Sequence, residues 1–151
     1  ALLREAKKRH IHTTIETCGH YPTDVLDQAC RVLDALIFDI KCLDSARHKK
    51  ATGVGSELIL KNIGHVFEHF PELPVLIRTP VIPGFNDTEE DILGIREMIP
   101  RKANIRYEAL TYHRMGQPKY GYLGRRYELE GVKADEAFMK RLNIMLKSYE
   151  K

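Results

Sequence analysis

The chain has 151 residues, of which 43% are hydrophobic and 30% charged, and a formal net charge of +3. This length and apolar content predict one domain, residues 1–151, with a core of its own. The positive charge is too small and too dispersed to indicate a nucleic-acid-binding protein. No apolar stretch is long enough to cross a bilayer and the first ten residues contain no signal peptide, so the sequence predicts a cytoplasmic protein.

Apolar runs predict four strands, at residues 11–16, 35–41, 75–79 and 104–111. Residues 1–9 favour a helix that has no capping residue before it, which suggests that the chain begins inside an element. Apolar side chains recur at helical spacing between the strands, and a long loop after the fourth strand leads to a last helix that begins at Asp135. The intervals between strands are long enough for helical crossovers, so we expect a parallel sheet with right-handed connections.

The predicted fold class is therefore α/β, with four parallel strands and covering helices. A closed eight-stranded barrel needs roughly 250 residues, so these strands would form only an arc of a TIM-type barrel. An arc leaves an unpaired strand edge and an open apolar face, which permits self-association.

Polar side chains follow the predicted strands at their carboxyl ends, where βα proteins place their active sites. The strand period of two places Asp39 and Lys41 on one face, and Arg78 ends the next strand. Charges inside a barrel are costly unless they are paired or used. One interpretation is a set of structural ion pairs among these three residues. The other is a clamp for a zwitterionic ligand, in which the acid binds an ammonium group and the bases bind a carboxylate.

Five segments carry a resemblance to a known family: IETCGHYP, LIFDIK, VLIRTPVIPGFND, YEALTYHRMGQPKY and LEGVK. In this order they closely resemble the radical S-adenosylmethionine activases of glycyl-radical enzymes, the pyruvate formate-lyase activating enzyme family. The resemblance extends from about residue 11 to residue 133.

The resemblance implies a partial (β/α)6 barrel with a [4Fe-4S] cluster and S-adenosylmethionine at the carboxyl ends of its strands. It implies reductive cleavage of S-adenosylmethionine to a 5′-deoxyadenosyl radical, which removes hydrogen from a glycine of a partner enzyme. The implied partners are a glycyl-radical enzyme, pyruvate formate-lyase or a relative, and an electron donor such as flavodoxin or ferredoxin.

The resemblance also implies which residues bind the cofactor, and these are Glu16, Thr17, Asp39, Lys41, Arg78, Ile82 and His113. Ile82 matches the position that packs on the adenine, and Glu16 with Thr17 matches a pair near the methionyl end. Asp39 and Thr17 are candidates to hold a monovalent cation. Taken alone, His113 is more typical of a satisfied core or surface residue than of a catalytic or binding group.

The cysteines depart from the family pattern. The family cluster needs three cysteines in a CxxxCxxC loop, whereas Cys18, Cys30 and Cys42 are twelve residues apart. That spacing matches neither a disulfide framework nor a closely spaced metal site, and three reduced thiols fit the cytoplasm. The Gly-Gly-Glu stretch that binds the methionyl ammonium group is also absent.

Both absent motifs lie upstream in the family, so we expect this chain to be the C-terminal portion of a longer activase, without its N-terminal strands. The chain alone is expected to have no catalytic residue, no iron–sulfur ligand and no radical activity. Two alternatives stay open. One is a naturally short, non-catalytic α/β module for binding or dimerisation, and the other is a Schiff-base aldolase-type barrel that uses Lys41 as its nucleophile beside Asp39.

Overall fold

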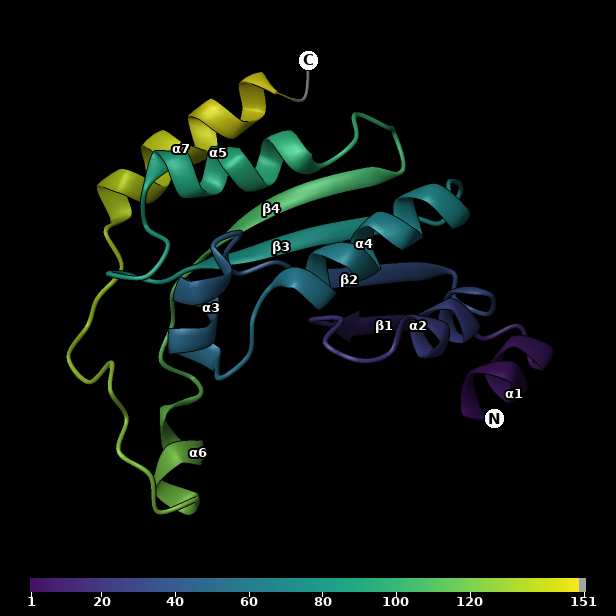
Figure 1. The fold of residues 1–151 in the computed structure, drawn as a ribbon, viewed down its shortest axis with the longest axis horizontal. Helices are drawn as coiled ribbons and strands as arrows, with labels where there is room; N and C mark the ends of the chain where they lie inside the picture. Colours follow the sequence, from purple (N-terminus) through teal and green to yellow (C-terminus); the bar gives the residue numbers. More distant parts are fainter. Residues whose placement is uncertain (150–151) are drawn as a thin grey trace.

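Four parallel strands form one curved sheet in the order β1-β2-β3-β4, so the expected α/β arc is confirmed (Figure 1). The structure is a computed structural model and describes residues 1–149. The strands are β1 (Thr14–Thr17), β2 (Ala35–Asp39), β3 (Val75–Val81) and β4 (Ile105–Thr111). The helices are α1 (Leu2–Lys8), α2 (Thr23–Cys30), α3 (Ser45–Thr52), α4 (Glu57–His69), α5 (Glu89–Met98), α6 (Gln117–Tyr122) and α7 (Glu136–Ser148).

The strand boundaries differ from the expected ones by up to three residues. Strand β1 begins at Thr14 rather than at residue 11, because the backbone N–H of Thr13 donates to Asp34 Oδ2 at 2.8 Å instead of to a strand. Strand β2 ends at Asp39, before Lys41. Strand β3 continues to Val81, because β4 extends beside it as far as Thr111.

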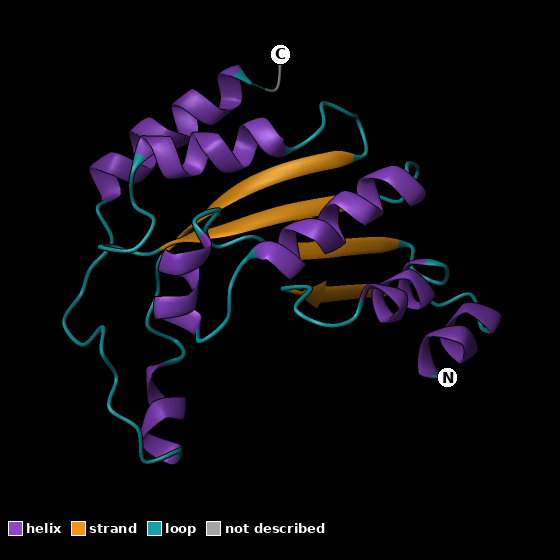
Figure 2. Ribbon diagram, viewed as in Figure 1, coloured by secondary structure: helices purple, strands orange, loops and turns teal. Residues whose placement is uncertain are grey.

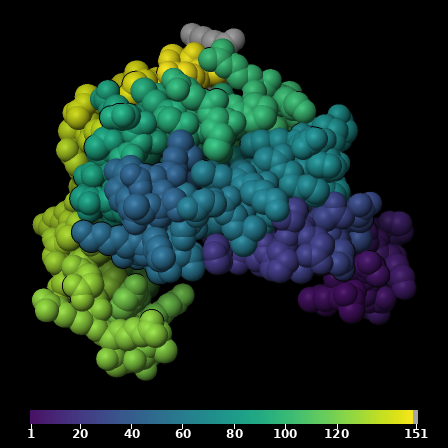
Figure 3. Space-filling view, in the orientation of Figure 1, coloured from purple at the N-terminus to yellow at the C-terminus, as the bar shows by residue number. Residues whose placement is uncertain are grey.

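Two helices lie in segments where the sequence analysis expected none. Helix α3 begins after Asp44, whose side chain accepts a hydrogen bond from the backbone N–H of Arg47 at 2.9 Å. It ends at Gly53, which has a φ of 88°, a left-handed conformation that glycine adopts without strain. Helix α6 interrupts the expected long loop after β4, and the segment that contains it projects from the body of the molecule (Figure 3).

One face of the sheet is covered by helices and forms the core (Figure 2). Leu36 and Phe38 of β2 and Val75 and Ile77 of β3 alternate with less buried neighbours and point into this layer. Helices α2 and α4 supply most of their apolar partners, and α5 and α7 pack over the ends of β3 and β4. None of the helices in residues 1–149 is long and apolar enough to cross a lipid bilayer.

The opposite face carries charges as well as apolar side chains. The register aligns Asp39 of β2 with Arg78 of β3, and Arg78 with Glu108 of β4. Ile37 and Leu76 lie one step earlier on the same face and are half-buried. The covered face therefore holds the sheet against its helices, and the opposite face presents the predicted site.

The buried phenol of Tyr107 makes the unfolding free energy depend on pH in the alkaline range. Burial raises the pKa of its phenol to about 12, above the ordinary value of 10. An acid whose pKa is raised in the folded state stabilises the fold below its unfolded pKa, and this stabilisation is lost as the pH rises. We predict that wild-type protein loses about 2 kcal/mol more unfolding free energy between pH 10 and 12 than Tyr107→Phe does. Urea denaturation across that range measures the difference. Tyr122→Phe, which changes an exposed tyrosine, should behave like wild type.

Candidate functional site

The carboxyl ends of β1, β2 and β3 bring four of the predicted cofactor-binding side chains together. Asp39 is the last residue of β2, and its register partner in β3 is Arg78. Glu16 comes from β1, and Lys41 follows β2 by two residues. The carboxyl end of the sheet therefore holds two acidic and two basic side chains.

Asp39 lies at the centre of the cluster. One of its carboxylate oxygens, Oδ2, is 3.3 Å from Lys41 Nζ, and the other, Oδ1, is 3.4 Å from both Nε and Nη2 of Arg78. Arg78 also pairs with Glu16. The side chains of Asp39 and Arg78 are 21% and 18% exposed, so they are sheltered but still reachable from the open face.

The environment of Arg78 keeps its guanidinium charged. Burial opposes the charge, but the hydrogen bond that Arg78 donates to Glu16 and the negative charge of Asp39 more than offset it, so the net effect raises the pKa of Arg78. The positive charge at this position is therefore permanent at any physiological pH.

The contacts to Asp39 leave room for a ligand. Charge-assisted hydrogen bonds in proteins are typically about 2.7–2.9 Å long, whereas both cations lie 3.3–3.4 Å from Asp39. A carboxylate can accept about four hydrogen bonds, so Asp39 retains acceptor capacity for an incoming ammonium group. Arg78 and Lys41 in turn could bind a carboxylate. The cluster is internally paired in this structure, and its chemistry also suits an amino-acid zwitterion, so the clamp stays a prediction.

The other three predicted residues lie around this cluster without contacting it. The Thr17 hydroxyl accepts a hydrogen bond from the backbone N–H of Gly19 at 3.0 Å, and Ile82 is half-buried directly after β3. His113 is exposed two residues after β4 and makes no hydrogen bond or ion pair with any residue from 1 to 149. Their roles in cofactor binding stay predictions.

Asn86 holds two of the strand ends in place, a role that the sequence analysis did not predict. Its side chain is fully buried. Its Nδ2 donates to the carbonyl oxygens of Lys41 at 2.7 Å and Pro80 at 2.9 Å, and its Oδ1 accepts from the N–H of Ile82 at 2.7 Å. One amide thus fixes the backbone beside Asp39 to the backbone that follows Arg78.

A second buried amide, Asn62 of α4, anchors the loop that follows β1. It donates to the carbonyl oxygens of Gly19 at 2.7 Å and Tyr21 at 2.8 Å, and accepts a hydrogen bond from the Thr23 hydroxyl at 2.7 Å. An asparagine within an apolar helical stripe is the sequence signal that could have identified it.

The cysteines of this chain do not fit an iron–sulfur cluster. Cys18 is exposed, whereas Cys30 and Cys42 are buried, and burial raises the pKa of the Cys30 thiol to about 11. Within residues 1–149 no three His, Cys, Asp or Glu side chains gather into a group that could hold a metal ion.

The Asn86 contacts predict a large loss of stability on truncation. Asn86→Ala leaves two buried carbonyls and one buried N–H without partners, so we expect the unfolding free energy to fall by about 3 kcal/mol. Asn104→Ala is the matched control, because the Asn104 side chain donates to the carbonyls of Pro71 and Leu73, at 2.9 Å each, at the opposite end of β3. Asn104 is only half-buried, so Asn104→Ala should lower the unfolding free energy by only about 1 kcal/mol. Urea denaturation of both variants makes the comparison, and equal losses would contradict the special role of Asn86.

Comparisons with known proteins identify relatives along nearly the whole chain, although no family model matches it. The chain is 99% identical over all 151 residues to the (2S)-3-sulfopropanediol sulfolyase activating enzyme of Bilophila wadsworthia, of which it covers 50%. It is 45% identical over 146 residues to the isethionate sulfite-lyase activating enzyme of Nitratidesulfovibrio vulgaris, covering 97% of this chain and 47% of that protein. The chain thus spans about half the length of these curated relatives.

A solved structure supports the same relationship. A domain of a pyruvate-formate lyase-activating enzyme from Bacteroides vulgatus superimposes with a TM-score of 0.73 at 25% sequence identity. The match covers 98% of this chain and 83% of that domain. Sequence and fold together confirm the expected resemblance: the chain is similar to one part of the activating enzymes of glycyl-radical enzymes.

Proposed function

We propose that the intact protein containing these residues activates a glycyl-radical enzyme, and that this chain supplies one wall of its S-adenosylmethionine site. The observation that carries the proposal is the ion-paired cluster at the strand ends, in which Asp39, Lys41 and Arg78 are half-buried and Glu16 is exposed. S-adenosylmethionine carries a methionyl ammonium and a carboxylate, which this pair of acids and pair of bases complement.

Each predicted residue receives a role in this proposal. Asp39 binds the ammonium group, while Arg78 and Lys41 bind the carboxylate. Glu16 orients Arg78 through their ion pair. Ile82 packs against the adenine.

Two further roles complete the proposed site. Thr17, together with Asp39, holds a monovalent cation near the methionyl end. His113 closes the site from the segment after β4. When bound beside a reduced [4Fe-4S] cluster, S-adenosylmethionine supplies a 5′-deoxyadenosyl radical, and the ligands of that cluster lie outside this chain.

The relatives suggest the partner. At 99% identity, the sulfolyase-activating relative favours (2S)-3-sulfopropanediol sulfolyase as the enzyme that is activated. A one-electron donor of the flavodoxin or ferredoxin type would reduce the cluster, and the three free thiols favour a reducing, cytoplasmic setting. The relatives described above are activating enzymes, which gives no support to a Schiff-base aldolase or to a stand-alone binding module.

The clamp can be tested by binding alone. In the intact protein, Arg78→Gln should weaken S-adenosylmethionine binding about tenfold or more, because a charged hydrogen-bond partner of the carboxylate is removed. Arg47→Gln is the matched control, since Arg47 pairs with Asp91 and takes no part in the cluster. Anaerobic calorimetry measures both affinities. Unchanged binding by Arg78→Gln would contradict the assignment of this cluster as the clamp.

The partner can be tested by radical formation. Intact protein with a reconstituted cluster, S-adenosylmethionine and a chemical reductant should generate a glycyl-radical electron paramagnetic resonance signal on (2S)-3-sulfopropanediol sulfolyase. Isethionate sulfite-lyase, the partner named for the 45% relative, serves as the comparison. A stronger signal on isethionate sulfite-lyase would overturn the partner assignment, and no 5′-deoxyadenosine with either enzyme would overturn the proposed activity.

A further inference from the structure

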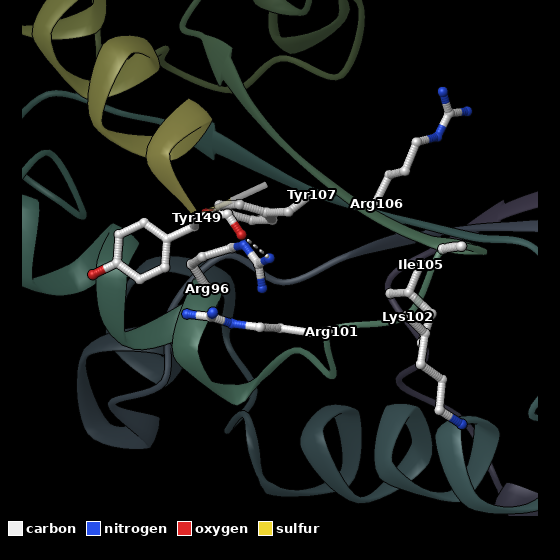
Figure 4. A pocket seen from close by; sticks show the side chains of 8 residues that line it. Arg96, Arg101, Lys102, Ile105, Arg106, Tyr107 and Tyr149 are labelled. Carbon is white, nitrogen blue, oxygen red and sulfur yellow. Dashed lines mark hydrogen bonds between the residues drawn. The ribbon is translucent and has the colours of Figure 1, made fainter. Parts of the chain in front are cut away.

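A concave site lies at the opposite end of the sheet from Asp39 and Arg78. A cavity of about 440 Å³ opens between the end of α5, the start of β4 and the end of α7 (Figure 4). Arg96, Arg101, Lys102, Arg106, Tyr107 and Tyr149 contribute the large side chains that line it. Because it lies at the amino end of β4, it is separate from the proposed cofactor site.

The charge of this cavity is uncompensated within the described part of the chain. Four of its lining residues are cationic and none is acidic. None of these four cations forms an ion pair with another residue between 1 and 149, whereas Arg47 pairs with Asp91 and Arg31 with Asp27. A cleft lined by charges of one sign focuses the local potential and attracts counter-ions.

Two of the cations are held beside the same aromatic ring. The guanidinium carbons of Arg96 and Arg101 lie 6.0 and 5.9 Å from the centre of the Tyr149 ring. Arg96 also donates to the carbonyl oxygens of Ile99 at 3.3 Å and Tyr149 at 3.4 Å. Figure 4 shows Arg96 and Arg101 extending toward Tyr149, while Arg106 and Lys102 point to other sides. The two arginines therefore form the centre of the site.

The arginines retain donors for a ligand. A guanidinium carries five N–H donors, and the bonds of Arg96 to the two carbonyls are long. Two guanidinium forks held beside one aromatic ring offer donors to a tetrahedral oxyanion, whose negative charge the cationic lining favours. We propose that this cavity binds the phosphate group of a small phosphorylated molecule, with Arg96 and Arg101 as its principal ligands.

Calorimetry of the intact protein with inorganic phosphate, at low ionic strength, tests this site. Arg101→Gln should raise the phosphate Kd about tenfold, because one charged donor group is lost. Arg125→Gln is the matched control: it removes the same charge from an exposed position that does not line the cavity, and should leave the Kd unchanged. Arg96→Lys, which keeps the charge but loses the fork, should also weaken binding.

Three results would overturn the proposal. Wild-type protein could fail to bind millimolar phosphate, or it could bind phosphate with the same Kd as Arg101→Gln. Acetate could bind as tightly as phosphate, which would show a site for carboxylates of ligands or protein segments. Phosphate could bind only after Glu150→Gln, which would show that the chain's own carboxylate fills the cavity; Glu150 lies outside the described residues. None of these results depends on S-adenosylmethionine, so a failure of the phosphate proposal would leave the proposed function untouched.

Discussion

The pairing of Asp39 with Arg78 across two parallel strands is the interaction on which the functional face of this molecule depends. The parallel register brings the two residues opposite one another at the carboxyl end of β2, on the face of the sheet that the helices leave uncovered. Their charges would be costly there if unpaired, and their mutual contact of 3.4 Å is long. A loosely paired acid and base in a sheltered position can be exchanged for the charges of a ligand at modest cost.

That exchange requires the strand ends to stay in place, and buried amides provide this. Asn86 joins the backbone after β2 to the backbone after β3, and Asn62 anchors the loop after β1. Both side chains are fully buried, and every bond they make is between 2.7 and 2.9 Å. The contacts of Asp39 are thus long, while the backbone that carries it is held by short hydrogen bonds from a buried amide.

Sequence periodicity was sufficient for the four strands, the parallel sheet and the inner-face position of Asp39, because alternation and crossover length indicate these features. It was insufficient for Asn86, because a buried amide that bonds to distant backbone has no local pattern. The first strand was expected too early because Ile11 and Thr13 are β-branched, yet Thr13 bonds to Asp34 instead. The cofactor roles of Ile82 and His113 were predicted only from the family resemblance, because an isolated isoleucine or histidine forms no sequence pattern that indicates a ligand.

The most direct measurement is an anaerobic crystal structure of the intact protein with S-adenosylmethionine. We predict that the ammonium group lies within hydrogen-bond distance of Asp39 and the carboxylate within reach of Arg78 or Lys41. We also expect at least one of the ion pairs within the cluster to be opened. S-adenosylmethionine bound elsewhere, with the contacts among Asp39, Arg78 and Glu16 intact, would show that this cluster is not the clamp.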